Sequence, residues 1–107
     1  MGYVSIIQLA TFMAVIEEGT MTGAARRLCY SQPAVSGHIR GLELTVGTPL
    51  LRRGPGPLAA TEAGDRLLLL APLLLQIAEQ IQHVGALRSP RSARERTLKA
   101  SPGIEFS

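Results

Sequence analysis

The sequence predicts a mainly α-helical fold: a winged helix-turn-helix of three helices and a short two-stranded wing, followed by a long helix. Three observations predict it. Two helix-forming segments are separated only by residues 29–31, which is the helix-turn-helix layout. Two short extended segments flank a Gly-Pro-Gly-Pro run, which is typical of a hairpin. A leucine-rich segment with heptad spacing then predicts a long helix.

The composition fits one small domain, or a domain with an extension, because the chain has 107 residues and 46% of them are hydrophobic. Aromatic residues make up only 4% and tryptophan is absent, so the core must be mostly aliphatic, which favours helices. The net charge is +3 and the sequence pI is about 9.8. Residues 1–60 and 88–107 are basic and residues 61–87 are acidic. Arginine supplies almost all of the positive charge, which suits contact with phosphate.

Several classes of protein are disfavoured by what the sequence lacks. Cys29 is the one cysteine, so neither an internal disulfide nor a multi-cysteine metal site is expected, and a cytoplasmic location is the simple inference. The apolar run 67–75 is far shorter than the roughly 20 residues that a bilayer span needs. His38 and His83 lie far apart, and neither a phosphate-binding loop nor a pair of catalytic carboxylates is evident. We therefore expect no enzyme activity, cofactor, metal or membrane association.

The first two helices are expected over residues 5–18 and 22–28. Apolar residues recur at helical spacing in the first, and Gly19 supplies its C-terminal stop. Thr20 and Thr22 are both suited to cap the second helix. We assign the cap to Thr22, which could also contact a phosphate of DNA.

The third helix is expected from a cap at Ser31 to about Val46. Pro33 fits the first turn, where its missing N–H costs nothing. The predicted buried face consists of residues at steps of four, three and four: Val35, Ile39, Leu42 and Val46. A Gly-Thr-Pro break at residues 47–49 ends the helix.

The wing and the long helix complete the predicted order. Residues 50–53 and 58–60 form the two extended segments of the hairpin. Thr61 is expected to cap a long helix that extends to about residue 87. Pro72 lies inside this helix and should kink or locally break it.

The long helix carries an apolar seam with heptad spacing, which predicts a coiled-coil-like contact. Its members are Leu67, Leu70, Leu74, Ile77, Ile81 and Val84. Four further leucines, Leu68, Leu69, Leu73 and Leu75, add a second apolar side. We expect one side to pack on the small domain and the other on a partner chain, so a homodimer is predicted.

The exposed edge of the third helix is small and nearly uncharged, which would let it enter the major groove of DNA. The candidate DNA-contacting residues on it are Ser31, Gln32, Pro33, Ala34, Ser36, Gly37 and Arg40. Glutamine can pair with adenine, serine with several base edges, and proline or alanine can touch a thymine methyl group, whereas Arg40 is better placed for phosphate. The pattern alone leaves open an ordinary capped amphipathic helix in a bundle.

The chain resembles the N-terminal DNA-binding domain of LysR-type transcriptional regulators. The resemblance rests on Leu9, Phe12 and Val15, followed by "EEGTMTGAARRL", "SQPAVSGHIRGLE", "VGTPLLRR" and "ATEAG". It implies a winged helix-turn-helix that binds double-stranded DNA, with linker helices that pair antiparallel in a dimer. It also implies that Arg53, the wing arginine, reaches the minor groove or its phosphates. A small-molecule effector would act only through a C-terminal domain, and full-length forms could assemble further.

The resemblance implies three parts: a DNA-binding domain over residues 1–61, a dimerisation helix over 62–87, and a flexible basic tail over 88–107 that begins an effector domain. Four residues depart from the family pattern: Gly37, Gly41, Leu51 and Ala60. Gly37 stands where many members have a longer base-contacting side chain, so backbone approach would replace that contact. Gly41 is expected to weaken the helix by about 1 kcal/mol relative to alanine.

Two functions are weighed on these grounds. The first is a sequence-specific DNA-binding regulator that binds an inverted repeat as a dimer, through the helix-turn-helix of residues 22–46 and the wing. The alternative is a truncated dimerisation module that pairs with full-length regulators and binds DNA only weakly itself. Gly37, Gly41 and Ala60 keep the alternative open, because each departs from the DNA-binding pattern.

Overall fold

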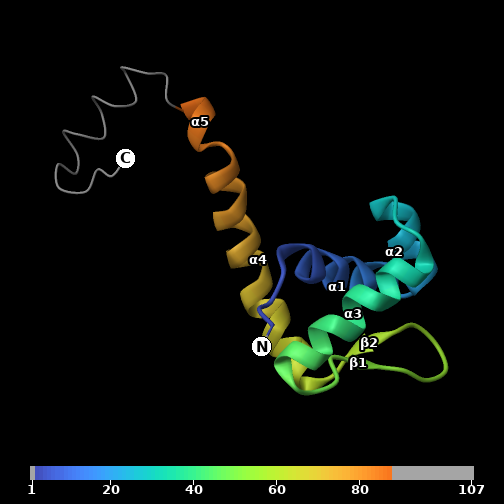
Figure 1. The fold of residues 1–107 in the computed structure, drawn as a ribbon. Helices are drawn as coiled ribbons and strands as arrows, with labels where there is room; N and C mark the ends of the chain where they lie inside the picture. The colour runs from blue at the N-terminus through green and yellow to red at the C-terminus, as the bar shows by residue number, and fades with distance from the viewer. Residues whose placement is uncertain (1, 88–107) are drawn as a thin grey trace. The chain divides into compact units, whose positions relative to one another are not determined.

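The computed structural model describes residues 2–87, and the fold is the predicted winged helix-turn-helix followed by a long helix (Figure 1). The chain divides into one compact unit, Met1–Leu75, and a second that begins at Gln76. The elements in order are α1 (Ile6–Glu18), α2 (Met21–Leu28), α3 (Gln32–Val46), β1 (Leu51–Arg52), β2 (Ala59–Ala60), α4 (Glu62–Gln82) and α5 (Val84–Leu87). The predicted tail at 88–107 lies outside the described residues.

Helix α1 is closed at both ends by its own sequence. The Ser5 hydroxyl accepts hydrogen bonds from the backbone N–H groups of Ile7 and Gln8, and the Gln8 side chain accepts one from the Ser5 N–H. This is a capping box, in which two otherwise unpaired donors are satisfied reciprocally. At the other end Gly19 adopts the left-handed conformation with φ of 80°, as a C-terminal glycine stop requires.

Helix α2 begins at Met21 because Thr20 caps it, so the assignment of the cap to Thr22 is wrong. Thr20 is extended, and its hydroxyl accepts a hydrogen bond from the Gly23 N–H at 2.9 Å. Thr22 is exposed inside the first turn, where the backbone is already helical and a cap cannot form. Helix α2 ends at Leu28, and the next residue, Cys29, is its C-cap and adopts a left-handed φ of 62° without being glycine. This residue makes the turn into α3.

Helix α3 begins and ends where the sequence indicates. Ser31 caps it by accepting a hydrogen bond from the Ala34 N–H at 3.2 Å, and Gly47 ends it with φ of 79°. Val35, Ile39 and Leu42 are fully buried, but Val46 is 39% exposed, so its predicted burial is wrong. Val46 is the last helical residue, a full turn beyond Leu42, and the hydrophobic core does not extend to this turn.

The core lies among the first three helices and the base of the wing. Its largest fully buried side chains are Leu9, Thr11, Phe12, Val15, Val35, Ile39, Leu42 and Leu50. Ala24 and Ala25 of α2 are also buried, and their small side chains let α2 pack closely against the rest. Ala71 of α4 completes the core. Burial of this aliphatic surface fixes the outward face of α3.

The wing is a two-stranded antiparallel hairpin that is shorter than predicted. Leu51 pairs with Ala60 and Arg52 with Ala59, so the strands have two residues each. Leu50 and Leu51 are buried, which anchors the base of the wing in the core, and the loop beyond β1 is exposed. The Leu58 N–H also donates a hydrogen bond to the Gly19 carbonyl at 2.9 Å, which ties the returning chain to the end of α1.

Helix α4 is capped by Thr61, whose hydroxyl accepts a hydrogen bond from the Gly64 N–H at 3.0 Å. The helix continues through Pro72 without a break and ends at Gln82, and a separate turn, α5, follows His83. One continuous helix to residue 87 is therefore wrong. Pro72 removes one donor from the ladder and is exposed, so the helix accommodates it. Over residues 2–87, none of the helices has the length and apolarity that a membrane crossing requires.

Candidate nucleic-acid interface

The structure places the predicted edge of α3 at the surface. Five of its candidate residues are exposed and two, Ala34 and Ser36, are half-buried; the exposed ones are Ser31, Gln32, Pro33, Gly37 and Arg40. The opposite side of α3 is fully buried through Val35 and Ile39. The edge is therefore accessible to a macromolecule. Burial of Val35 and Ile39 in the core determines which side of α3 faces outward.

The two glycines of α3 serve different purposes. No atom lies within 4 Å of the position that a Cβ of Gly37 would occupy, so the surface is open there. At Gly41, in contrast, a Cβ would lie 2.7 Å from Nε2 of Gln8, a member of the α1 capping box. Gly41 thus makes room for the side chain of Gln8. The sequence analysis considered only the low helix propensity of Gly41 and missed this packing role.

His38 is held by the domain itself. Its Nδ1 lies 3.0 Å from the hydroxyl of Thr11, which is fully buried in α1, and its ring meets Tyr30 edge-to-face at 5.0 Å between centroids. A buried hydroxyl needs such a partner, because an unpaired one costs free energy. His38 therefore links α3 to α1 and to the turn before α3. We interpret it as a structural residue of the interface.

The wing carries two exposed arginines, Arg52 and Arg53. Neither forms an ion pair with an acid among residues 2–87, and the same holds for Arg26 and Arg40. Unpaired, exposed guanidinium groups are suited to phosphate. Arg53, the predicted wing contact, follows β1 directly.

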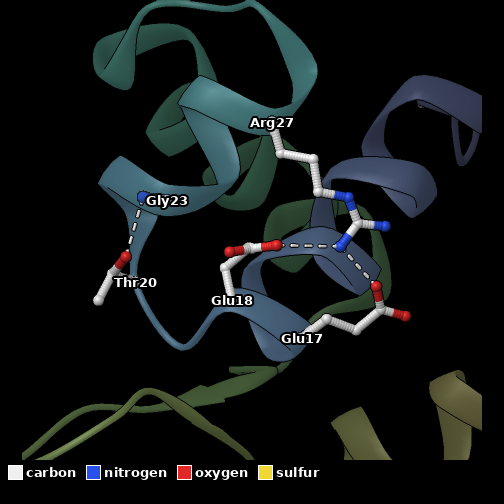
Figure 2. A network of polar contacts seen from close by, with 5 residues as sticks. All are labelled: Glu17, Glu18, Thr20, Gly23 and Arg27. Carbon is white, nitrogen blue, oxygen red and sulfur yellow. Dashed lines mark hydrogen bonds and ion pairs between the residues drawn. The ribbon is translucent and has the colours of Figure 1, made fainter.

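Arg27 is engaged differently, as Figure 2 shows: its guanidinium lies between two carboxylates of α1. Nη1 is 2.6 Å from Oε1 of Glu17 and 3.4 Å from Oε2 of Glu18. The hydrogen bond to Glu17, and after it that to Glu18, raises the pKa of Arg27 above its ordinary value. Arg27 therefore fastens α2 to the C-terminal end of α1.

Glu43 is a further residue that sequence reasoning missed. Its Oε2 accepts hydrogen bonds from the backbone N–H groups of Leu50, at 2.7 Å, and Leu51, at 3.2 Å. It thereby connects α3 to the base of the wing. The only sequence signal was the Leu-Glu pair at the end of the family motif, which gives no indication of the partner.

The apolar seam of the long helix is mostly exposed. Leu70, Leu74, Ile77, Ile81 and Val84 are all exposed, whereas Leu67 is partly buried and packs against the core of its own domain. On the second apolar side Leu68 and Leu75 also pack on the core, but Leu69 and Leu73 are exposed. Within residues 2–87, no three His, Cys, Asp or Glu side chains lie together as a metal site would require.

Helix α3 has an exposed edge opposite a buried face, and the wing carries two arginines without ion pairs among residues 2–87. Together these features define a DNA-binding domain of the winged helix-turn-helix class. Residues 6–65 match the family model described as bacterial regulatory helix-turn-helix protein, lysR family, so the chain belongs to the LysR family of transcription regulators. This family regulates transcription and is not a family of enzymes.

Known relatives agree with this assignment. The regulator CysL of Bacillus subtilis is 44% identical over 72 residues, which cover 67% of this chain and 24% of CysL. The crystal structure of the BenM DNA-binding domain with catB site 1 DNA superposes with a TM-score of 0.72 at 33% identity, over 81% of this chain and 98% of that one. The CbnR DNA-binding domain–DNA complex gives 0.71 at 34% identity, over 77% and 94%. The chain thus spans about a quarter of the length of CysL.

Proposed function

We propose that the chain is a sequence-specific DNA-binding transcription regulator that binds an inverted repeat as a dimer, one domain to each half-site. The observation that carries the proposal is the exposed, nearly uncharged edge that begins at Ser31, Gln32 and Pro33, backed by a fully buried face. Such an edge fits the major groove, since residues 31–37 carry no long charged side chain that would hold the helix away from the bases. The two DNA complexes of related domains support the same mode of binding.

The roles that we propose follow from side-chain chemistry. Gln32 and Ser36 contact base edges, Pro33 and Ala34 touch thymine methyl groups, and Gly37 admits close approach of the backbone. Phosphate contacts come from Arg40 on α3, from Ser31 at its cap and from Thr22 on α2, all of which have exposed side chains. Arg53 reaches the minor groove or its phosphates from the wing.

The salt dependence of binding tests the DNA-binding proposal. The affinity of the chain for a random duplex should fall steeply as salt rises, with a log–log slope of about −0.9 for each phosphate that is neutralised. Selection of bound sites from a random DNA pool should then yield one preferred sequence with two related halves. A flat salt curve, or a pool that yields no preferred sequence, would contradict the proposal.

We further propose that five exposed apolar side chains at heptad spacing form the homodimer contact: Leu70, Leu74, Ile77 and Ile81 of α4 and Val84 of α5. Ile81→Glu tests this. Because Ile81 is 65% exposed, the change should leave the domain folded. It should weaken self-association by about tenfold or more, since an unpaired carboxylate would be buried. Sedimentation measures the effect, and unchanged self-association would count against α4.

The same exposed apolar side chains also favour a second candidate function, a dimerisation module that captures longer regulators of its family. Mixed dimers with a full-length relative would be expected, together with a flat salt curve for DNA. The salt curve separates this function from DNA binding. We also propose a cytoplasmic location and, for longer forms of the protein, a small-molecule effector that acts through a C-terminal domain.

A further inference from the structure

The short segment that leads into the wing is held from two sides by side chains and backbone of the neighbouring helices. On one side Oε2 of Glu43 accepts the N–H groups of Leu50 and Leu51 at 2.7 and 3.2 Å. On the other side the Thr61 hydroxyl donates to the Pro49 carbonyl at 2.8 Å, and the Thr61 N–H donates to the Leu50 carbonyl at 3.0 Å. The polar backbone of residues 49–51 is thus bonded to α3 and to the cap of α4.

Glu43 is an acidic residue on the helix that, in the proposed function, presents its edge to DNA. A carboxylate near phosphate groups is repelled by them. Glu43 is half-buried and its acceptor oxygen is occupied by two backbone donors, so it does not face outward as a free charge. Hydrogen bonds with one charged partner are stronger than neutral ones. The contact is therefore suited to holding backbone in place.

We propose that Glu43 is a positioning residue for DNA binding, which sets the wing in register with α3 so that Arg53 and the Gln32 edge meet one duplex together. Arg53 lies two residues after Leu51, so the segment that Glu43 holds leads directly into the wing arginine. The role rests on the proposed function, in which Arg53 contacts DNA. Glu43 itself touches no nucleotide in this role.

A double-mutant cycle between Glu43 and Arg53 tests the proposal. On the site selected from the random pool, Glu43→Ala should weaken binding by about tenfold, the loss expected for charged hydrogen bonds that are no longer made. In a protein that already carries Arg53→Ala, the same change should have little further effect, because the group that Glu43 positions is absent. A loss of fold integrity alone would weaken both backgrounds equally.

Three further variants separate position from charge and from folding. Glu43→Gln keeps an acceptor oxygen but makes only neutral hydrogen bonds, so its affinity should lie between those of the wild type and Glu43→Ala. Asp65→Asn removes the charge of one exposed acid in the first turn of α4, which pairs with no basic side chain among residues 2–87, and it reports the effect of charge alone. Glu43→Asp keeps the charge but shortens the side chain, and it replaces Glu43→Ala in the cycle if that variant melts below the assay temperature. Melting is followed by circular dichroism for every variant.

The outcomes are distinct. If Glu43→Ala weakens binding only when Arg53 is present, and Glu43→Gln recovers part of the loss, the positioning role holds. If the loss is the same with and without Arg53, or if there is no loss, the role is overturned while the DNA contact of Arg53 stands. If Arg53→Ala alone leaves binding to selected and random duplexes unchanged, the proposed wing contact fails and the positioning role fails with it.

Discussion

Gly64→Ala is expected to destabilise the domain, although the same change in most helices is stabilising. Alanine normally improves on glycine in a helix by up to about 1 kcal/mol. At Gly64, however, a Cβ would lie 2.4 Å from the carbonyl oxygen of Leu50, 3.0 Å from Cβ of Ala60 and 3.2 Å from Cζ of Phe12. These neighbours are backbone or core atoms that cannot move aside cheaply.

The expected loss in the free energy of unfolding is about 1–3 kcal/mol, the usual cost of overpacking. Urea denaturation measures it, with Gly37→Ala as the matched control. At Gly37 a Cβ meets nothing within 4 Å, so that change should raise the free energy of unfolding by up to about 1 kcal/mol. If both substitutions change the free energy of unfolding in the same direction, the tight packing of α4 against the base of the wing at Gly64 is contradicted.

This contrast bears on how the wing is built. Gly64 allows the first turn of α4 to lie against the carbonyl of Leu50, the same group that accepts the Thr61 N–H. The close packing and the hydrogen bond therefore act on one peptide unit. Glu43 binds the same residue through its N–H. A change at Gly64 should thus disturb the wing as well as the stability of the helix.

Local chemistry explains why much of the fold could be predicted from the sequence. Ser31 and Thr61 cap α3 and α4, and Gly19 and Gly47 end α1 and α3, because each residue type meets a requirement of the backbone at that point. These signals depend on a few neighbouring residues only. They fixed the order of the helices without knowledge of their packing.

The errors have tertiary causes. Thr20 and Thr22 have equal capping chemistry, and only the path of the chain after Gly19 decides between them. Val46 continues the apolar spacing of α3 but lies beyond the end of the core, which spacing cannot reveal. Pro72 was expected to kink or locally break α4, and the break does not occur, because the helix runs on through Pro72 and ends ten residues later at Gln82.

The candidate interface divides in the same way. The exposed edge of α3 follows from helical periodicity, since burying Val35 and Ile39 exposes the opposite side. The contacts of Glu43, Gln8 and Arg27 do not follow from helical periodicity, because each of them joins residues of different elements. The exposure of residues on one helix could therefore be predicted from the sequence, whereas contacts that connect helices could not.

Gln32→Ala is the most direct test of how the proposed regulator recognises sequence. Gln32 is exposed at the start of α3, so its truncation should leave the free energy of unfolding nearly unchanged. On the selected site it should cost about 1–3 kcal/mol for each half-site, because a bidentate contact with adenine is lost. On random duplex DNA it should cost almost nothing, since phosphate contacts supply that affinity.

The measurement is a competition assay in which each base pair of one half-site is replaced in turn. The variant should lose its preference at one base pair and keep it at the others. Gln82→Ala, which removes an exposed glutamine at the end of α4, serves as the matched control and should leave every preference intact. Equal weakening on selected and random DNA would assign Gln32 to the phosphate backbone instead. Sequence recognition would then have to come from the remaining groups of the α3 edge, of which Ser36 is the next candidate.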